Sequence, residues 1–277
     1  MNEHNLDMDG FVRWMRLEER SESTVEKYLR DLRGLERWLG GGELNRDALI
    51  RWKKHLMDNG YSPVTINGML ATVNTYCRYA GLDIRARFLR IQRRLFREEE
   101  KNLTGVEYER LIDATRKLGR KRLGLLLETI GGTGMRVSEV KYVTVEGAKS
   151  GRIRICLKGK IRMILLPKKL CRKLLEYAKQ QKIQTGQIFI TRSRKAIGRK
   201  QIWAEMKGLC LTAKVAPSKV FPHNLRHLFA QMYYSHTKDV AKLADLLGHS
   251  SMETTRIYLV SSGVEQEKQI NRLGLVS

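Results

Sequence analysis

The chain has 277 residues, 42% of them hydrophobic and 30% charged, and its formal net charge is +24. Its length favours two domains, and the charge is uneven: residues 1–100 carry a net charge of +2 and residues 101–277 a net charge of +22. Such an excess is typical of a protein that binds nucleic acid, although a basic ribosomal protein or a merely soluble basic protein would show it too.

The same composition argues against several classes of protein. Four scattered cysteines form no C-x-x-C pair, which argues against a zinc ribbon and favours reduced thiols. The N-terminus lacks the basic-then-apolar pattern of a signal peptide, and no run of about 18 apolar residues predicts a membrane span. We therefore expect a cytoplasmic protein without a membrane partner.

Residues 1–83 are expected to form a domain of four helices. A short helix is predicted over residues 8–17. Three longer helices have clear start signals: the capping box Ser23-Thr24-Val25-Glu26, Asn45, and Ser62 followed by Pro63. Glycines at 40–42 and at 81 are expected to end the first and the third of these longer helices.

Residues 84–102 are interpreted as a basic linker between the two domains. The stretch from 84 to 97 holds six arginines and no acidic residue. Guanidinium groups there would contact phosphates as the chain crosses a duplex, and a solvated, partly helical connector is the alternative. The candidate DNA contacts in this segment are Arg85, Arg87, Arg90, Arg93 and Arg94, and Lys160 further along the chain is another.

Residues 103–277 are expected to form a second domain, opened by a capping box of Thr104 and Glu107. Two β-type runs, 152–157 and 161–166, flank Lys158-Gly159-Lys160 and predict a hairpin, and residues 188–190 are a candidate third strand. Helices are expected over residues 105–118, 121–131, 168–182, 199–213, 223–235, 239–247 and 251–260. The predicted fold class is mainly α with a small antiparallel β-sheet.

Polar residues with reactive side chains gather near the C-terminus. Arg226 lies in an apolar stretch, and a buried guanidinium needs an anionic partner, either a carboxylate or a bound phosphate. His223 and His227 have the four-residue spacing of metal ligands, but Asn224 stands where the metalloprotease pattern has glutamate. We therefore expect no metal, and we expect His227 to support the fold.

Two further candidates follow along the chain. Gly248 is expected to end one helix and the run Ser250-Ser251-Met252-Glu253 to cap the next, which places His249 in the corner between them. Tyr258, late on the second helix, would then approach the same point. Taken alone, His249 would be a helix cap and Tyr258 a core or interface residue.

Together these residues resemble the signature of the tyrosine recombinases, the phage-integrase and Xer-type family. In the family's order the chain carries Thr133-Gly134-Met135-Arg136-Val137-Ser138-Glu139, the hairpin Lys158, His223-Asn224-Leu225-Arg226-His227, Leu247-Gly248-His249 and Tyr258. The N-terminal helices, with Thr24, Tyr28 and Asp31, resemble the family's core-binding, SAM-like domain. The resemblance covers nearly the whole chain and implies two domains that form a C-shaped clamp on DNA.

The resemblance also implies how a DNA phosphate would be bound. Arg136 and Arg226 would grip its non-bridging oxygens, a task that suits planar, always-charged guanidinium groups. His249 would donate a hydrogen bond to the same phosphate. Glu139 would orient Arg136, although it could equally be an ordinary surface acid.

The remaining roles concern the reaction itself. Tyr258 would attack phosphorus and form a 3′-phosphotyrosyl link, with His223 as its base. Lys158 would protonate the departing 5′-oxygen, and Lys160 is a rival because the turn is one residue shorter than the family's usual hairpin. Neither a metal nor a cofactor is required.

The implied activity is site-specific recombination of double-stranded DNA through a Holliday junction, by a homo-tetramer on two duplexes. The C-terminal tail, residues 263–275, would dock on a neighbouring subunit, and accessory proteins remain possible. We expect a role in integrating or excising a mobile element in a bacterial or phage-related setting. The alternatives are Xer-like resolution of a chromosome or plasmid, a DNA-binding protein that has lost catalysis, and a type IB topoisomerase.

Overall fold

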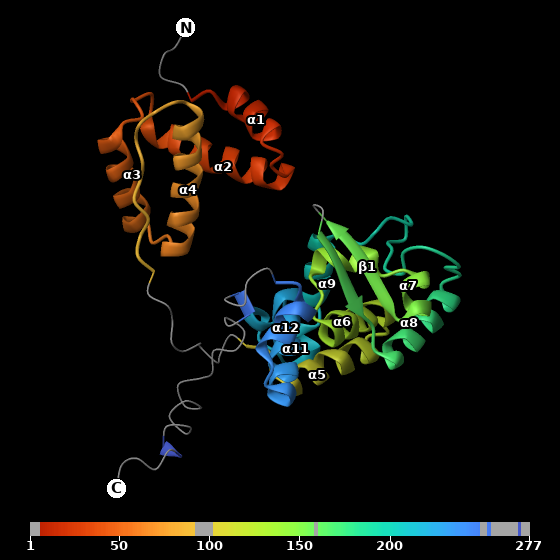
Figure 1. Ribbon diagram of the computed structural model, residues 1–277. Coiled ribbons are helices and arrows are strands. Elements are labelled where there is room, and N and C mark those ends of the chain that lie inside the picture. Colours follow the sequence, from red (N-terminus) through yellow and green to blue (C-terminus); the bar gives the residue numbers. More distant parts are fainter. Residues whose placement is uncertain (1–5, 92–101, 158–159, 250–253, 256–270, 273–277) are drawn as a thin grey trace. The chain divides into compact units, whose positions relative to one another are not determined.

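The computed structural model describes residues 6–91, 102–157, 160–249, 254–255 and 271–272. The chain divides into two compact units, Met1–Arg93 and Arg94–Ser277 (Figure 1). Among the described helices, none combines the length and the apolar character that crossing a bilayer requires.

The first unit consists of four helices around one apolar core. They are α1 (Met8–Leu17), α2 (Glu22–Leu39), α3 (Arg46–Asp58) and α4 (Pro63–Tyr79). Each helix buries one stripe and leaves its polar face to solvent, as expected for helical amphipathic patterns. The fully buried side chains include Phe11, Met15, Leu32, Leu35, Ile66 and Leu70.

Local capping explains most of the helix boundaries in this unit. The side chain of Asn45 accepts a hydrogen bond from Ala48 N over 2.9 Å, and Ser62 accepts one from Thr65 N over 3.2 Å, as predicted. The expected start at Ser23 is wrong. Helix α2 begins at Glu22 because Ser21 already has the extended backbone of an N-cap residue.

The segment after α4 is extended and held against the first unit. Asn74 exchanges two hydrogen bonds with the backbone of Ala86, 2.8 and 3.0 Å long, and Asn67 exchanges two with Leu89, 2.7 and 2.9 Å long. Each amide group therefore pairs with the backbone as a neighbouring β-strand would. The exposed arginines of this segment are Arg85, Arg87 and Arg90, whereas Arg93 and Arg94 lie outside the described residues.

The second unit is built around helix α6 (Lys121–Thr133), which packs against α5, α8, α9 and α11. Because α6 is surrounded, most of its residues are buried. The elements around it, in chain order, are α5 (Gly105–Lys117), a 3-10 helix η2 (Val137–Tyr142), α7 (Val145–Ser150), α8 (Lys168–Gln180), α9 (Arg199–Lys207), α10 (Cys210–Ala213), a 3-10 helix η3 (Pro217–Lys219), α11 (Pro222–Thr237) and α12 (Val240–Leu247).

One antiparallel hairpin lies beside these helices, formed by β1 (Arg152–Leu157) and β2 (Lys160–Leu165) (Figure 1). Lys160 pairs with Leu157, so the second strand begins one residue earlier than predicted. The third strand expected over residues 188–190 is wrong. Among the described residues that region makes only isolated bridges, from Thr144 to Gln187 and from Ile190 to Ala196.

Two other expectations about helices need correction. The single helix predicted over residues 199–213 is two helices, because α9 ends at Gly208, a residue of low helix propensity. The η2 and α7 helices were not predicted, since each is too short to show a helical repeat. The capping box of Thr104 and Glu107 is confirmed, with both reciprocal hydrogen bonds present.

Candidate active site

A glycine turn after α6 delivers the first site residue. Gly134 has φ +63°, and a Cβ atom there would lie 2.4 Å from the ring of Phe229 and 2.9 Å from Leu247. Both the backbone conformation and the space therefore favour glycine. The tight turn lets α11 and α12 approach the end of α6, and it places Arg136 at the start of η2.

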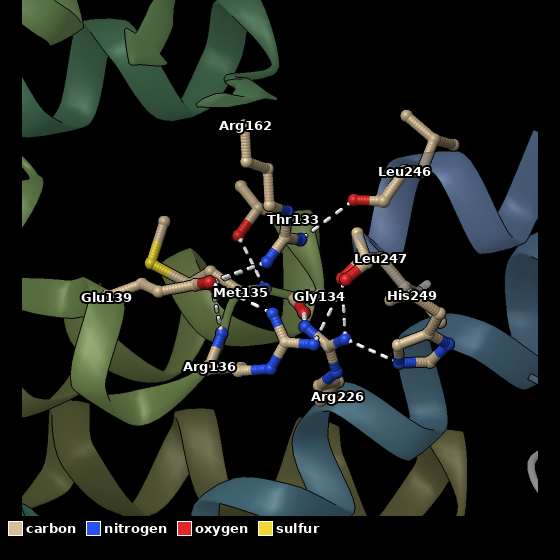
Figure 2. Close-up of polar contacts among 11 residues, drawn as sticks. Thr133, Gly134, Met135, Arg136, Glu139, Arg162, Arg226, Leu246, Leu247 and His249 are labelled. Carbon is tan, nitrogen blue, oxygen red and sulfur yellow. Dashed lines mark hydrogen bonds and ion pairs between the residues drawn. The ribbon is translucent and has the colours of Figure 1, made fainter. Parts of the chain in front are cut away.

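Glu139 lies beneath Arg136 as a buried anion. Its side chain is only 3% exposed, so the alternative of an ordinary surface acid is wrong. Glu139 accepts a hydrogen bond from Arg136 N over 2.7 Å and one from Arg136 Nη1 over 3.2 Å. It also accepts two from Arg162 Nη1, over 2.6 and 2.8 Å. One carboxylate thus serves two guanidinium groups (Figure 2).

Arg226, on α11, is 2% exposed and reaches across to other elements. It donates from Nη1 to Gly134 O over 2.6 Å and from Nη2 to Leu247 O over 2.7 Å. Its Nη2 also lies 2.8 Å from Nε2 of His249. Carbonyl oxygens thus supply two of the contacts of this buried guanidinium group.

The three arginines converge on the C-terminal end of α12. Three consecutive carbonyl oxygens each accept a hydrogen bond from a different arginine. Leu246 O accepts from Arg162 over 2.8 Å, Leu247 O from Arg226 over 2.7 Å, and Gly248 O from Arg136 over 3.2 Å (Figure 2). The last carbonyls of a helix lack partners within the helix, and its C-terminal end carries partial negative charge. Residues 246–248, which we call the α12 carbonyl end, are therefore a fixed acceptor for positive charge.

Arg162 is the member of this group that sequence reasoning missed. It lies on β2, with a side chain only 12% exposed. Burial lowers the pKa of Arg162 from its usual value, Glu139 opposes this effect, and nearby Arg136 adds to it. The two-residue period of a strand was the available signal, since Arg162 shares a face with buried Ile164.

His249 follows Gly248, which ends α12 with φ +62°, as predicted. Its Nε2 faces Arg226, and its Nδ1 lies 2.8 Å from Oγ1 of Thr255, a fully buried residue. A guanidinium group only donates, so Nε2 accepts and Nδ1 carries the hydrogen of the neutral ring. Thr255 is a second contact that sequence reasoning did not identify.

The surroundings of His249 favour its neutral form. Burial, together with the smaller effects of Arg226, Arg136, Arg162 and His223, lowers the pKa of His249 to about 4. At neutral pH, therefore, the imidazole accepts a hydrogen bond from Arg226. A hydrogen bond from Nε2 to a phosphate requires either protonation of the ring or a shift of its hydrogen from Nδ1.

The two histidines of α11 have different settings. His223 is exposed in the first turn of α11, three residues before Arg226 on the same helix. His227 is 2% exposed, inside the second unit. Within the described parts of the chain, no group of three His, Cys, Asp or Glu side chains gathers where a metal ion could be held.

The remaining candidates cannot be placed by their side chains. Lys158 and Tyr258 lie outside the described residues, as does the tail over 263–270 and 273–275. Lys160 is described by its backbone alone, as the first residue of β2. The structure therefore brings Arg136, Arg226, Glu139 and His249 into one cluster with Arg162, beside His223.

Comparison with known proteins identifies the family of the chain. Residues 101–263 match the Phage integrase family, and residues 8–82 match the N-terminal SAM-like domain of phage integrases. The chain belongs to the phage integrase family, the tyrosine recombinases, which confirms the resemblance drawn from the sequence motifs.

Individual relatives match most of the chain. A tyrosine recombinase XerA from Thermococcus kodakarensis is 31% identical over 272 residues, covering 93% of this chain and 92% of the relative. A tyrosine recombinase XerD from Xanthomonas axonopodis pv. citri is 34% identical over 268 residues, covering 86% and 87%. The XerH recombinase in its post-cleavage complex with palindromic difH substrate has a similar fold, with a TM-score of 0.72, 18% identity and coverage of 93% and 86%.

Proposed function

We propose that this recombinase cuts and rejoins double-stranded DNA at specific sites through a covalent link to Tyr258. The observation that carries the proposal is the convergence of Arg136 and Arg226 on the α12 carbonyl end, next to His249. Two neighbouring guanidinium groups suit a phosphodiester, because a planar cation can donate two parallel hydrogen bonds to non-bridging oxygens.

In the proposed binding step, a phosphate takes over donors that now point at carbonyl oxygens. Arg136 is 43% exposed and would turn toward the phosphate most readily, whereas Arg226 is buried and would hold it from beneath. The negative charge of the phosphate raises the pKa of His249, which favours a hydrogen on Nε2. His249 then changes from acceptor to donor.

In the proposed cleavage step, the phenolic oxygen of Tyr258 forms a bond to phosphorus as the bond to the 5′-oxygen breaks. The proton of the phenol passes to His223, and the 5′-oxygen takes a proton from Lys158 or Lys160. Arg136 and Arg226 stabilise the extra negative charge of the five-coordinate transition state. No metal or cofactor takes part in this scheme.

Rejoining reverses these steps with a 5′-hydroxyl from a partner strand. Two rounds through a Holliday junction would exchange strands between two sites, in a homo-tetramer on two duplexes. The net charge of +22 on residues 101–277 and the exposed Arg85, Arg87 and Arg90 support a grip on the DNA backbone. Docking of the C-terminal tail on a neighbouring subunit, help from accessory proteins, a DNA clamp formed by both units and a cytoplasmic setting belong to the same proposal.

The biological role has two candidates. Relatives named XerA and XerD, which match over 86% or more of this chain, favour an Xer-like role in resolving a chromosome or plasmid. Integration or excision of a mobile element is the second candidate. It would use the same strand-exchange chemistry, so the site residues do not distinguish the two roles.

A two-site assay tests the proposed function. The DNA is first selected from a random-sequence pool by covalent capture on the wild-type protein, and two copies are then placed in one plasmid. Strand exchange between the two copies is expected, and a plasmid with a single copy is the control. Relaxation of supercoils on single-copy plasmids without any exchange would instead indicate a topoisomerase, and binding without covalent capture would indicate an inactive DNA-binding protein.

A further inference from the structure

The contacts of Glu139 are unequal. Both of its oxygens accept from Arg162, over 2.6 and 2.8 Å, whereas the side chain of Arg136 makes one longer contact of 3.2 Å. Short contacts between charged groups are the stronger ones. Arg162 therefore takes the larger share of this buried carboxylate, and Arg136 is held only weakly.

The position of Arg162 keeps it away from solvent and in place. It is 12% exposed, and its Nη2 donates to Leu246 O over 2.8 Å. A Cβ atom on Gly248 would lie 2.5 Å from Cδ of Arg162, so the glycine leaves room for this side chain to pass. The hairpin is thus tied at one point to both Glu139 and the α12 carbonyl end.

The charges show what would happen without Arg162. The carboxyl group of Glu139 would stay buried, with Arg136 as the nearby guanidinium group to answer it. An uncompensated buried carboxylate is strongly unfavourable, so Arg136 would turn toward Glu139 and away from the site. A phosphate would then compete with Glu139 for Arg136.

We infer that Arg162 is a positioning residue: by neutralising Glu139 and holding the α12 carbonyl end, it leaves Arg136 available to the scissile phosphate. This inference rests on the proposed function. Arg162 does not itself touch the phosphate. Its effect is on the rate of cleavage of bound DNA, and much less on the affinity for DNA, which many backbone contacts share.

The test uses the full chain and a nicked duplex, selected from a random-sequence pool by covalent capture on the wild-type protein. Rates of adduct formation are measured in single turnover at saturating DNA, together with the dissociation constant for the same duplex and the melting temperature. The wild type and Tyr258→Phe are run first. If the wild type forms no adduct, the proposed function has failed before Arg162 is examined.

For Arg162→Ala we expect an adduct rate at least about tenfold lower, with a dissociation constant within about threefold of the wild type. The decisive variant adds Glu139→Gln, which removes the charge but keeps an oxygen for Arg136 N. The double variant is expected to react at least about threefold faster than Arg162→Ala, because Arg136 is no longer drawn to Glu139. A side chain that merely stabilised the fold would give no such rescue.

Two further variants complete the design. Arg154→Ala removes an exposed arginine from the other strand of the same hairpin, and its adduct rate at saturating DNA should stay within about twofold of the wild type. Arg162→Lys replaces Arg162→Ala if the latter does not fold. One ammonium group cannot reach both Glu139 and Leu246 O in the same fork geometry, so a slower rate and rescue by Glu139→Gln are again expected. An unchanged rate, or a double variant no faster than the single one, overturns the inference.

Discussion

Arg226 donates a hydrogen bond to Nε2 of His249 over 2.8 Å. An imidazolium ring has no acceptor, so this contact is compatible only with a neutral ring at His249. The protonation state of the His249 ring therefore links Arg226, for which we propose phosphate binding, to the chemistry that we propose for His249.

The first prediction concerns how the stability of the fold depends on pH through His249. The pKa of His249 is about 4 in the folded chain and near 6.5 in an unfolded one, so the unfolded chain binds more protons between these values. Stability attributable to the neutral ring is therefore complete above pH 6.5 and falls as the pH drops toward 4. When the pH is lowered from 7.5 to 5, the free energy of unfolding of the wild type should fall. That of His249→Gln should fall by on the order of 1 kcal/mol less. Urea unfolding at both pH values measures this, and equal losses would contradict it.

The second prediction concerns Thr255, which contacts Nδ1 of His249. A hydroxyl group both donates and accepts, so it serves the ring with its hydrogen on either nitrogen. Thr255→Val leaves Nδ1 without that partner and should slow adduct formation at saturating DNA about tenfold or more. Thr255→Ser keeps the hydroxyl and should stay within about threefold. Equal rates for the two variants would show that the hydroxyl has no part in cleavage.

The third prediction concerns Arg226. Arg226→Ala should slow adduct formation by about 10²–10³-fold, as loss of a preorganised transition-state contact does. Affinity should fall much less, because one phosphate contact among many contributes little. Single-turnover rates and a binding isotherm on the same duplex separate the two effects. Unchanged cleavage kinetics would remove Arg226 from the proposed site.

The fourth prediction concerns the extended segment after α4. Asn74→Ala breaks both hydrogen bonds to Ala86 and should weaken DNA binding about three- to tenfold, because Arg85 and Arg87 lose their fixed positions. The adduct rate at saturating DNA should change by less than about twofold. Asn59→Ala, which affects an exposed amide that bonds to His55 O at the end of α3, is the matched control. Equal affinities for the two variants would mean that this segment does not contact DNA.

Local patterns in the sequence predicted the elements that depend on neighbouring residues. The capping box of Thr104 and Glu107, the N-caps Asn45 and Ser62, and the helix end at Gly248 were predicted because each depends on a few adjacent residues. The misplaced start at Ser23 shows the limit of the same reasoning. Ser21 and Ser23 are both suitable N-cap residues. The sequence alone does not show which of them has the extended backbone of an N-cap.

Contacts across the fold were harder to predict. The motifs indicated that Arg136, Arg226 and His249 belong to one site, but not that the α12 carbonyl end answers both arginines. Backbone acceptors carry no sequence signature. Arg162 was missed for a related reason: its partner Glu139 is 23 residues away, and only the packing of the hairpin on η2 brings them together.

We propose above that the phenolic oxygen of Tyr258 becomes covalently joined to DNA. The measurement is a denaturing gel of the protein with a nicked duplex that is selected from a random-sequence pool. After cleavage the short strand with the 5′-hydroxyl diffuses away, so rejoining cannot occur and the adduct accumulates. We expect a slow-migrating protein–DNA band for the wild type and none for Tyr258→Phe, with native binding of the duplex nearly equal for both. A band of equal strength with Tyr258→Phe, or no band with the wild type on any duplex from the pool, would contradict it.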